Sequence, residues 1–302
     1  MIGQRVRRAI ERRSARRKLA LVIAAYDMPR QIERTLRSLS PGMQRGIGAE
    51  DYELIVVDNG SREPIDRAAC EASGAPVRWL EVPDAPPSPA RAINLGLAAA
   101  RAPLVGVMVD GARMASPGLL RAAAIAARLA ERPVVLTHGY HLGDDWQQRT
   151  VAEGYDEAAE ERLLERSGWA EDGYRLFDVS VPGASSRDGW YELPHESNCL
   201  FMPAPMWSEL GGFDERFTSP GGGLVNLDVM ARACALPGAQ PIVVVGEATF
   251  HQVHGGVTTG AAPSSRWESQ QDEYRRLRGS AYVRPDVRPL LLGLRPPPEN
   301  RG

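Results

Sequence analysis

Short apolar runs alternate with helical patterns along the first half of the chain. We expect buried strands, each ending in a turn, at 18–26, 52–61, 77–82, 103–109 and 132–139. Between the first two, Ile32, Leu36 and Leu39 recur at helical spacing, and further helices are predicted after Ser88 and Ser116, each followed by proline. Alternation of this kind predicts one α/β domain with a mostly parallel central sheet flanked by helices.

The pattern loosens after residue 140. We expect a helix over 156–170 that serves as a lid or an oligomer contact, and then an irregular polar and aromatic connection over 178–198. Regular elements return as strands at 199–203 and 241–246 and as helices at 204–210, 225–236 and 264–277.

Composition changes this picture little. Apolar residues make up 43% and charged residues 25%, with a net charge of −2, which gives no argument for a nucleic-acid partner. Eight Arg and Lys lie in residues 5–18, where a solvated helix is the simpler interpretation and a membrane or polyanion contact the alternative. Three scattered cysteines and the absence of a signal-peptide pattern or an 18-residue apolar run favour the cytoplasm.

Two aspartates follow predicted strands. Asp58 and Asp110 each stand where an apolar run ends and a turn begins. The carboxyl ends of strands form the ligand-binding edge of open α/β sheets, so the two acids are expected to share one crevice. The alternative for each is a local turn or helix cap.

Two common nucleotide sites are absent from the sequence. The segment after the first strand, VIAAYDMPRQIE, has no glycine, and the pattern G-x-x-x-x-G-K-[ST] does not occur. An ordinary dinucleotide dehydrogenase and a P-loop NTPase are therefore poor interpretations of this sequence.

Four segments, in their order and spacing, resemble the inverting family 2 glycosyltransferases of GT-A fold: LVIAAYDMPRQIERTLRSL, YELIVVDNGS, ARAINLGLAAARAPLVGVMVDGA and ELGGFDERF. The similarity runs over about residues 18–256. It implies transfer of a sugar from a nucleoside diphosphate, with UDP expected, to a hydroxyl or amine acceptor. It also implies a basic extension (1–17), a donor-binding half (18–140), an acceptor and catalytic half (141–262) and a C-terminal helix and tail (263–302).

The resemblance implies roles for six positions on the donor side. Ala25 and Tyr26 would touch the base, and Asp58 the base and ribose. Asn94 would lie on the helix that flanks the donor, and Arg91 just before it would contact a phosphate. Asp110 matches the first acid of the D-x-D motif, which binds ribose and a Mg²⁺ or Mn²⁺ ion on the diphosphate.

The sequence departs from the family pattern twice. The second acid of D-x-D is missing, since Asp110 is followed by Gly111 and Ala112, and Asn226 stands where the family has its catalytic base. An amide cannot accept the acceptor's proton, so Asp228 and Glu196 become the candidate bases. For Asp228 the alternative is a helix-terminal residue favoured by the dipole. Whether the reaction inverts or retains configuration stays open.

Histidines near the C-terminus offer a replacement ligand. Several GT-A enzymes use a histidine from this region on their metal, and His251 and His254 follow the strand predicted at 241–246. On a strand, residues three apart face opposite sides, so we expect only one of the two to reach the metal with Asp110.

The acceptor side is less defined. Trp190 and Tyr191 are candidates for a stacking surface, and Glu192, His195 and Glu196 supply polar groups nearby. Loop packing and a solvated turn are equally good interpretations of these residues.

A second function class remains open, a non-catalytic nucleotide-sugar-binding protein, supported by Ala112 and Asn226. A sugar nucleotidyltransferase is a weaker third reading, because Tyr26-Asp27-Met28 stands where a Gly-rich basic loop is expected. Peripheral membrane contact and homodimer formation are additional expectations for the leading reading.

Overall fold

The structure is a computed structural model that describes residues 17–254 and 263–294. Its strands are β1 (Leu19–Ala25), β2 (Tyr52–Asp58), β3 (Val77–Glu81), β4 (Leu104–Met108), β5 (Arg113–Ala115), β6 (Pro133–Leu142), β7 (Ser180–Pro182), β8 (Cys199–Pro203), β9 (Gln240–His251) and β10 (Leu290–Gly293). Its α-helices are α2 (Pro29–Ser38), α3 (Arg67–Ala72), α4 (Ala90–Ala99), α5 (Leu119–Ala126), α6 (Gln147–Thr150), α7 (Glu157–Ser167), α8 (Ala204–Leu210), α9 (Val225–Cys234) and α10 (Pro263–Arg278). Four short 3₁₀ segments are η1 (Val151–Glu153), η2 (Gly173–Val179), η3 (Ala184–Ser186) and η4 (Pro220–Gly222).

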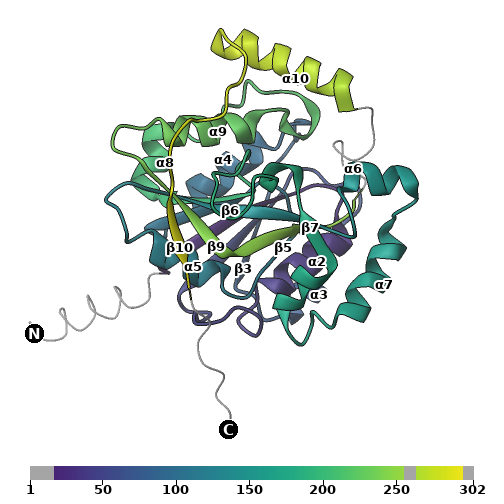
Figure 1. The fold of residues 1–302 in the computed structure, drawn as a ribbon. Coiled ribbons are helices and arrows are strands. Elements are labelled where there is room, and N and C mark those ends of the chain that lie inside the picture. Colours follow the sequence, from purple (N-terminus) through teal and green to yellow (C-terminus); the bar gives the residue numbers. More distant parts are fainter. Residues whose placement is uncertain (1–16, 255–262, 295–302) are drawn as a thin grey trace, which may run out of the picture.

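One mixed sheet runs through the molecule in the order β10-β9-β6-β8-β4-β1-β2-β3 (Figure 1). The strands β1 to β4 are parallel to one another, as are β6, β9 and β10. The antiparallel strand β8 joins these two groups by pairing with β4 and β6. The expected fold class, a single α/β domain with a mostly parallel sheet flanked by helices, is confirmed.

Both faces of the sheet are buried, which explains why its strands are continuous apolar runs. Along β1, Leu19, Leu21, Ile23 and Ala25 pack in the core that includes α2 and α5. The β1 residues between them, Ala20, Val22 and Ala24, pack in the second core, which includes residues of α4, α8 and α9. Figure 1 shows these helices on opposite sides of the sheet. The period of two places every β1 side chain in a core.

A third core holds the connection between β6 and β8 against the sheet. It contains Met114, Tyr140, Leu142, Leu164, Trp169, Leu176, Ala248 and Phe250. Of the segment predicted to be irregular, 178–198, Val179 and Trp190 pack against this core.

The structure corrects several sequence predictions. The last core strand does not end at residue 246 but continues to His251, and the three-residue strand β5 was not predicted. The helices expected after Ser88 and Ser116 have their N-caps at Pro89, one position later, and at Gly118, two positions later. Ser116 is instead buried and donates a hydrogen bond to Glu247. The pattern of apolar and polar positions does not reveal this contact.

Some predictions fall outside the described residues. The basic segment is described only at its end, Arg17 and Lys18, and residues 255–262 and 295–302 are also outside. Within the described part, no helix is long and apolar enough to cross a membrane. Membrane contact and a homodimer stay predictions.

Candidate active site

A cleft of about 1200 Å³ opens at the carboxyl ends of β1 and β4. Ala25 and Tyr26 line it after β1, and Asp110 lines it after β4. Its other walls come from the loop before β8, the start of α9 and the end of β9. This is the edge at which ligands bind in open α/β sheets.

Three possible metal ligands meet in this cleft. Oδ2 of Asp110 lies 3.0 Å from Nε2 of His251 and 3.4 Å from Nε2 of His254. One ligand atom from each residue falls within a group 4.8 Å across. The side chains of His251 and His254 are 7% and 10% exposed, and that of Asp110 is 21% exposed, so the group is shielded but open to the cleft.

The strand that sequence analysis missed brings these residues together. In the antiparallel pair of β5 and β9, Arg113 lies opposite His251. Gln252 then donates its backbone N–H to the Ala112 carbonyl at 2.8 Å, which extends the contact toward Asp110. Both histidines lie within 3.4 Å of Asp110, because β9 ends at His251 and His254 lies beyond the strand, outside the alternation on which the expectation of a single ligand rested.

The same packing limits which side chains fit in the two positions after Asp110. Ala112 is fully buried in the hydrophobic core, where a carboxylate would lose its hydration. A side chain at Gly111 would place its Cβ 2.8 Å from Met28 Sδ and 3.0 Å from the Ala24 carbonyl oxygen. A carboxylate at position 112 would therefore be unfavourable in this structure, and His251 and His254 lie beside Asp110.

The three side chains shift each other's pKa values. Burial alone would raise the pKa of Asp110, but the adjacent His254 and His251 hold it well below its usual range. Burial lowers the pKa of His251 to about 4, although Asp110 opposes this shift. Burial also disfavours charge on His254, yet the Asp110 carboxylate outweighs it and raises the pKa of His254. An ionised carboxylate and an imidazole with a free lone pair are the forms that bind a metal.

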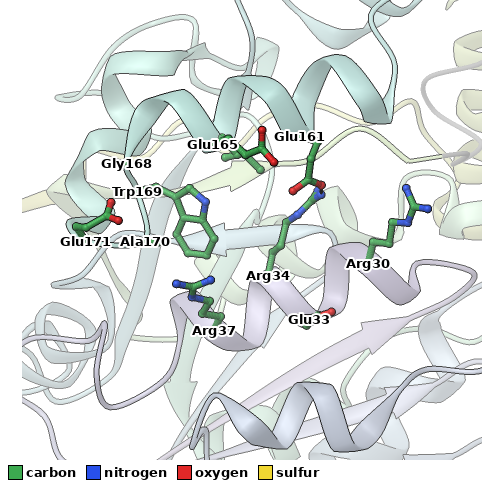
Figure 2. Close-up of a pocket in the computed structure, with 11 residues that line it drawn as sticks. Arg30, Glu33, Arg34, Arg37, Glu161, Glu165, Gly168, Trp169, Ala170 and Glu171 are labelled. Carbon is green, nitrogen blue, oxygen red and sulfur yellow. Dashed lines mark hydrogen bonds and ion pairs between the residues drawn. The ribbon is translucent and has the colours of Figure 1, made fainter.

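Buried polar contacts hold the segment from His251 to His254, which we call the ligand turn. Gln31 of α2 donates its side-chain N–H to the Val253 carbonyl at 2.8 Å, and Glu160 of α7 accepts from the Val253 N–H at 2.6 Å. Arg34 pairs with Glu160 and with Glu161. Figure 2 shows Arg34 reaching from α2 to Glu161 across a groove of about 340 Å³. The ligand turn is therefore clamped between α2 and α7.

Glu160 gives the fold a specific pH dependence. Burial raises its pKa to about 8, although the Val253 N–H and Arg34 oppose this. Between pH 6.5 and 8 the unfolded chain carries an ionised Glu160 while the native state still holds the proton, so raising the pH lowers stability. We expect this loss, on the order of 1 kcal/mol per pH unit, to be absent in Glu160→Gln. Urea unfolding of both proteins across that range is the measurement, and parallel slopes would contradict the prediction.

Glu196 lies on the cleft wall near the metal ligands. Its carboxylate is 3.6 Å from the Arg113 guanidinium, and its side chain is 29% exposed. The next residue, Ser197, donates a hydrogen bond of 2.9 Å to the Asn226 carbonyl, and both Glu196 and Asn226 line the cleft. Glu196 therefore stands beside the position at which the family resemblance places its base.

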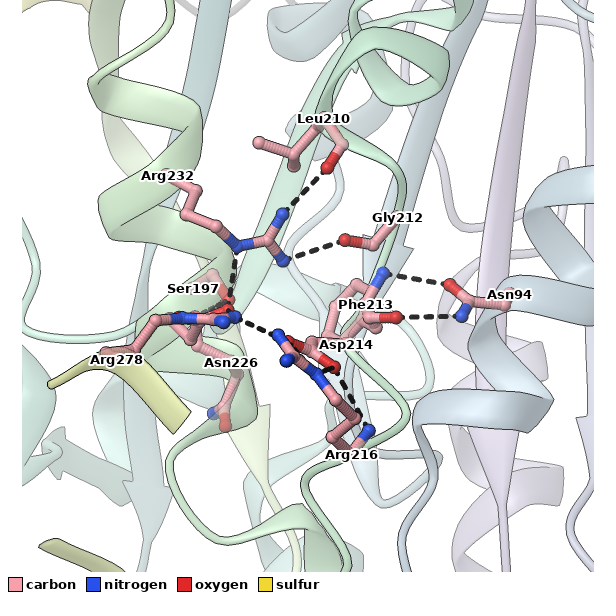
Figure 3. A network of polar contacts seen from close by, with 11 residues as sticks. Asn94, Ser197, Leu210, Gly212, Phe213, Asp214, Arg216, Asn226, Arg232 and Arg278 are labelled. Carbon is pink, nitrogen blue, oxygen red and sulfur yellow. Dashed lines mark hydrogen bonds and ion pairs between the residues drawn. The ribbon is translucent and has the colours of Figure 1, made fainter. Parts of the chain in front are cut away.

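Asp228 has a different environment. It is fully buried, and Arg232 and Arg278 occupy its two carboxylate oxygens at distances of 2.6 to 2.8 Å. Arg232 also donates to the carbonyls of Leu210 and Gly212, and Arg278 reaches Asp214 (Figure 3). Asp228 does not line the cleft, and its contacts join α9 to α10.

These contacts predict a structural effect for Asp228. Asp228→Ala would leave two arginines without their buried counter-charge, and we expect it to lower the free energy of unfolding by about 3 kcal/mol. Arg216→Ala is the control in the same network, because its side chain is 64% exposed and should contribute less than about 1 kcal/mol. Urea unfolding measures both. Unchanged stability with lost turnover in Asp228→Ala would instead support a catalytic role.

The remaining donor-side predictions are placed outside the cleft lining. Asp58 accepts the Ser61 N–H at 2.8 Å, which is the local turn considered as its alternative. Asn94 exchanges two 2.8 Å hydrogen bonds with the backbone of Phe213 and so fixes the turn after α8. Arg91 is exposed on α4. Neighbouring Asn59, which sequence analysis did not select, lines the cleft instead of Asp58.

Of the residues predicted on the acceptor side, some line the cleft and others do not. His195 lines the cleft and contacts Asp188 and Arg187. Trp190 packs with His138, Tyr140 and Phe177 at ring-centroid distances of 5.3 to 5.9 Å, and Tyr191 is 71% exposed away from the lining. The wall carries another aromatic residue, Trp267 of α10, which is 47% exposed.

Sequence analysis missed several cleft residues: His141, Arg113, Gln147 and Trp267. Arg113 had one usable signal, a charge three positions after Asp110 between apolar segments. The other three have no signal in the sequence, because the partners that place them are distant along the chain.

Comparison with known proteins shows a shared fold. Neither a model of a known protein family nor a curated protein matches this chain in sequence. Residues 1–349 of TarS from S. aureus align with 87% of this chain and 74% of their own length, at a TM-score of 0.54 and 12% identity. The same fragment in complex with UDP-GlcNAc covers 88% and 68%, at 0.55 and 13%. A mycobacterial protein covers 91% and 79%, at 0.50 and 18%.

Proposed function

We propose that this chain is a metal-assisted glycosyltransferase that moves a sugar from a nucleoside diphosphate to a hydroxyl or amine acceptor. The observation that carries the proposal is the meeting of Asp110, His251 and His254 in a cleft of about 1200 Å³ at the ends of β1 and β4. That volume suits a nucleotide sugar together with part of an acceptor.

A nucleoside diphosphate sugar is the proposed donor. Ala25, Tyr26 and Asn59 line the end of the cleft where a base would lie, at the ends of β1 and β2. The TarS fragment shares this fold and was solved with UDP-GlcNAc, which supports UDP as the nucleotide.

The three ligand residues fit a divalent cation. One ionised carboxylate and two imidazoles converge, and their nitrogens lie within 3.4 Å of the same carboxylate oxygen. The imidazole ligands favour Mn²⁺ over Mg²⁺, which prefers oxygen ligands and water. A bound cation would neutralise negative charge on the diphosphate as it departs.

Glu196 is the proposed general base. Its carboxylate would accept the proton of the acceptor hydroxyl as that oxygen forms a bond to the anomeric carbon and the bond to the diphosphate breaks. Arg113 positions Glu196 from the β5 side. Asp228 is less suited to this step, because both of its oxygens are engaged by arginines.

Release of nucleoside diphosphate tests the proposal. We would incubate the protein and Mn²⁺ with UDP-, GDP- and dTDP-sugars and a panel of sugar, lipid and peptide acceptors. Acceptor-dependent release from one donor would support the enzyme. Tight, Mn²⁺-dependent binding of a nucleotide sugar without release would favour the second candidate, a non-catalytic binding protein, which the cleft position of Asn226 supports. Absence of both binding and release would overturn both.

A further inference from the structure

Gln147 contacts two histidines of the cleft in two different ways. It is fully buried at the start of α6. Its side-chain Nε2 donates to the His251 carbonyl oxygen at 2.9 Å, so its Oε1 is the atom that faces Nδ1 of His251. An amide oxygen only accepts, and Nδ1 of His251 must therefore carry the hydrogen. The lone pair of a neutral His251 is then on Nε2, which faces the Asp110 carboxylate at 3.0 Å. Two acceptor atoms at this distance need a cation between them, and a metal ion would supply it.

The backbone of the same residue imposes the opposite arrangement on His141. The Gln147 N–H donates to Nδ1 of His141 at 3.1 Å. Nδ1 is thus the acceptor, and the hydrogen of the neutral ring lies on Nε2. His141 lines the cleft, and its ring centroid is 5.6 Å from that of His251.

The Nε2 edge of His141 lies next to Gly183. A Cβ at Gly183 would lie 3.1 Å from both Nε2 and Cδ2 of His141, so the absence of a side chain there gives this edge of the ring its room. His141 does not belong to the ligand group found among the described residues, which contains Asp110, His251 and His254. It lies next to that group, and its Nε2 carries a hydrogen and so has no lone pair for a metal.

We propose that Gln147 assigns different roles to these two histidines, and that His141 binds the donor by donating its Nε2–H to a diphosphate oxygen. Gln147 is a positioning residue that presents His251 Nε2 as a ligand. His141 supplies a neutral hydrogen bond to phosphate without adding a positive charge beside the cation. This inference rests on the proposed nucleotide-sugar donor and adds a phosphate contact that the family resemblance does not assign.

The hydrogen positions are tested first, on the protein loaded with Zn²⁺ as a diamagnetic cation, because without a cation the Asp110 carboxylate would itself favour a hydrogen on Nε2 of His251. Long-range ¹H–¹⁵N correlation spectra distinguish the two neutral tautomers of each histidine. We expect the hydrogen of His251 on Nδ1 and that of His141 on Nε2, and we expect His251 to lose its preference in Gln147→Leu. The reverse assignment in the wild-type protein would overturn the role of Gln147.

Substitutions at His141 test the phosphate contact. His141→Asn keeps an acceptor near the Nδ1 position for the Gln147 N–H but removes the distal donor, and His141→Gln keeps a distal donor. By calorimetry with saturating Mn²⁺, we expect His141→Asn to weaken UDP binding about tenfold and His141→Gln to restore most of it. Affinity for Mn²⁺ alone and for uridine should stay within about twofold in both variants.

The outcomes separate this inference from the proposed function. If wild-type protein binds Mn²⁺ and UDP but His141→Asn binds UDP normally, or loses uridine and UDP equally, the phosphate role is overturned and the donor proposal stands. If wild-type protein binds neither, the donor proposal fails and takes the His141 contact with it. The spectra need no nucleotide, so they test the role of Gln147 separately from the donor.

Discussion

Asp110→Asn is expected to abolish Mn²⁺-dependent UDP binding and to lower turnover by at least about 100-fold. The carboxylate oxygen of Asp110 is the atom on which both histidine nitrogens converge, at 3.0 and 3.4 Å. An amide there provides a weaker, neutral ligand, and loss of a partner that only supports a ligand already costs about 10- to 100-fold. Calorimetry with and without Mn²⁺ measures binding, and nucleotide release measures turnover.

Asp58→Asn is the matched control. Asp58 also follows a parallel strand, but it accepts the Ser61 N–H and does not line the cleft. An asparagine oxygen can accept the same hydrogen bond, so we expect near wild-type Mn²⁺-dependent binding. Equal losses in the two variants would contradict a specific metal site at Asp110.

Glu196→Gln is expected to lower turnover by about 10²- to 10⁴-fold while UDP and Mn²⁺ bind almost as in the wild type. The amide keeps the size of the side chain but cannot take the acceptor proton. Glu192→Gln is the control, because Glu192 is exposed in the same connection and does not line the cleft. A Glu196→Gln variant with full turnover would remove Glu196 from the mechanism.

The same residue predicts a pH profile. Burial raises the pKa of Glu196, Asp110 adds to that rise, and Arg113 opposes it. A base works in its ionised form, so turnover should increase with pH through a pKa above the usual range of glutamate. Initial rates across pH 4 to 9 measure this. If turnover instead rises with the ordinary pKa of a glutamate, a group other than Glu196 controls the pH dependence.

The central parallel strands could be predicted from the sequence, because burial on both faces makes each of them a continuous apolar run. The predicted strands at 18–26, 52–61 and 103–109 match β1, β2 and β4 closely. The rule that strand ends carry ligand sites then placed Asp110 correctly at a cleft.

The pairing of distant segments was not predictable from the pattern. Three residues of β5 are too few to show a period, yet their register with β9 places Arg113 opposite His251. A family resemblance suggested that a histidine reaches Asp110, and the end of β9 explains why a second one does.

For Asp228 and Trp190, the difference between the predicted role and the structure comes from side-chain partners distant in the sequence. A sequence shows that Asp228 begins a helix, but not that Arg278, fifty residues away, pairs with it. Likewise Trp190 has the composition of a sugar-stacking residue, and only the nearby rings of Tyr140 and Phe177 reveal that it packs in the third core. Polar and aromatic residues gain their roles from such long-range neighbours.

Anomalous diffraction from crystals soaked in Mn²⁺ and UDP is the most direct test of the central claim. We predict one strong manganese peak within ligand distance of Asp110, His251 Nε2 and His254 Nε2, with the diphosphate of UDP beside it in the cleft. Ordered UDP without a manganese peak at these three residues, or a peak only at other acidic residues, would contradict the metal site on which this account of the protein depends.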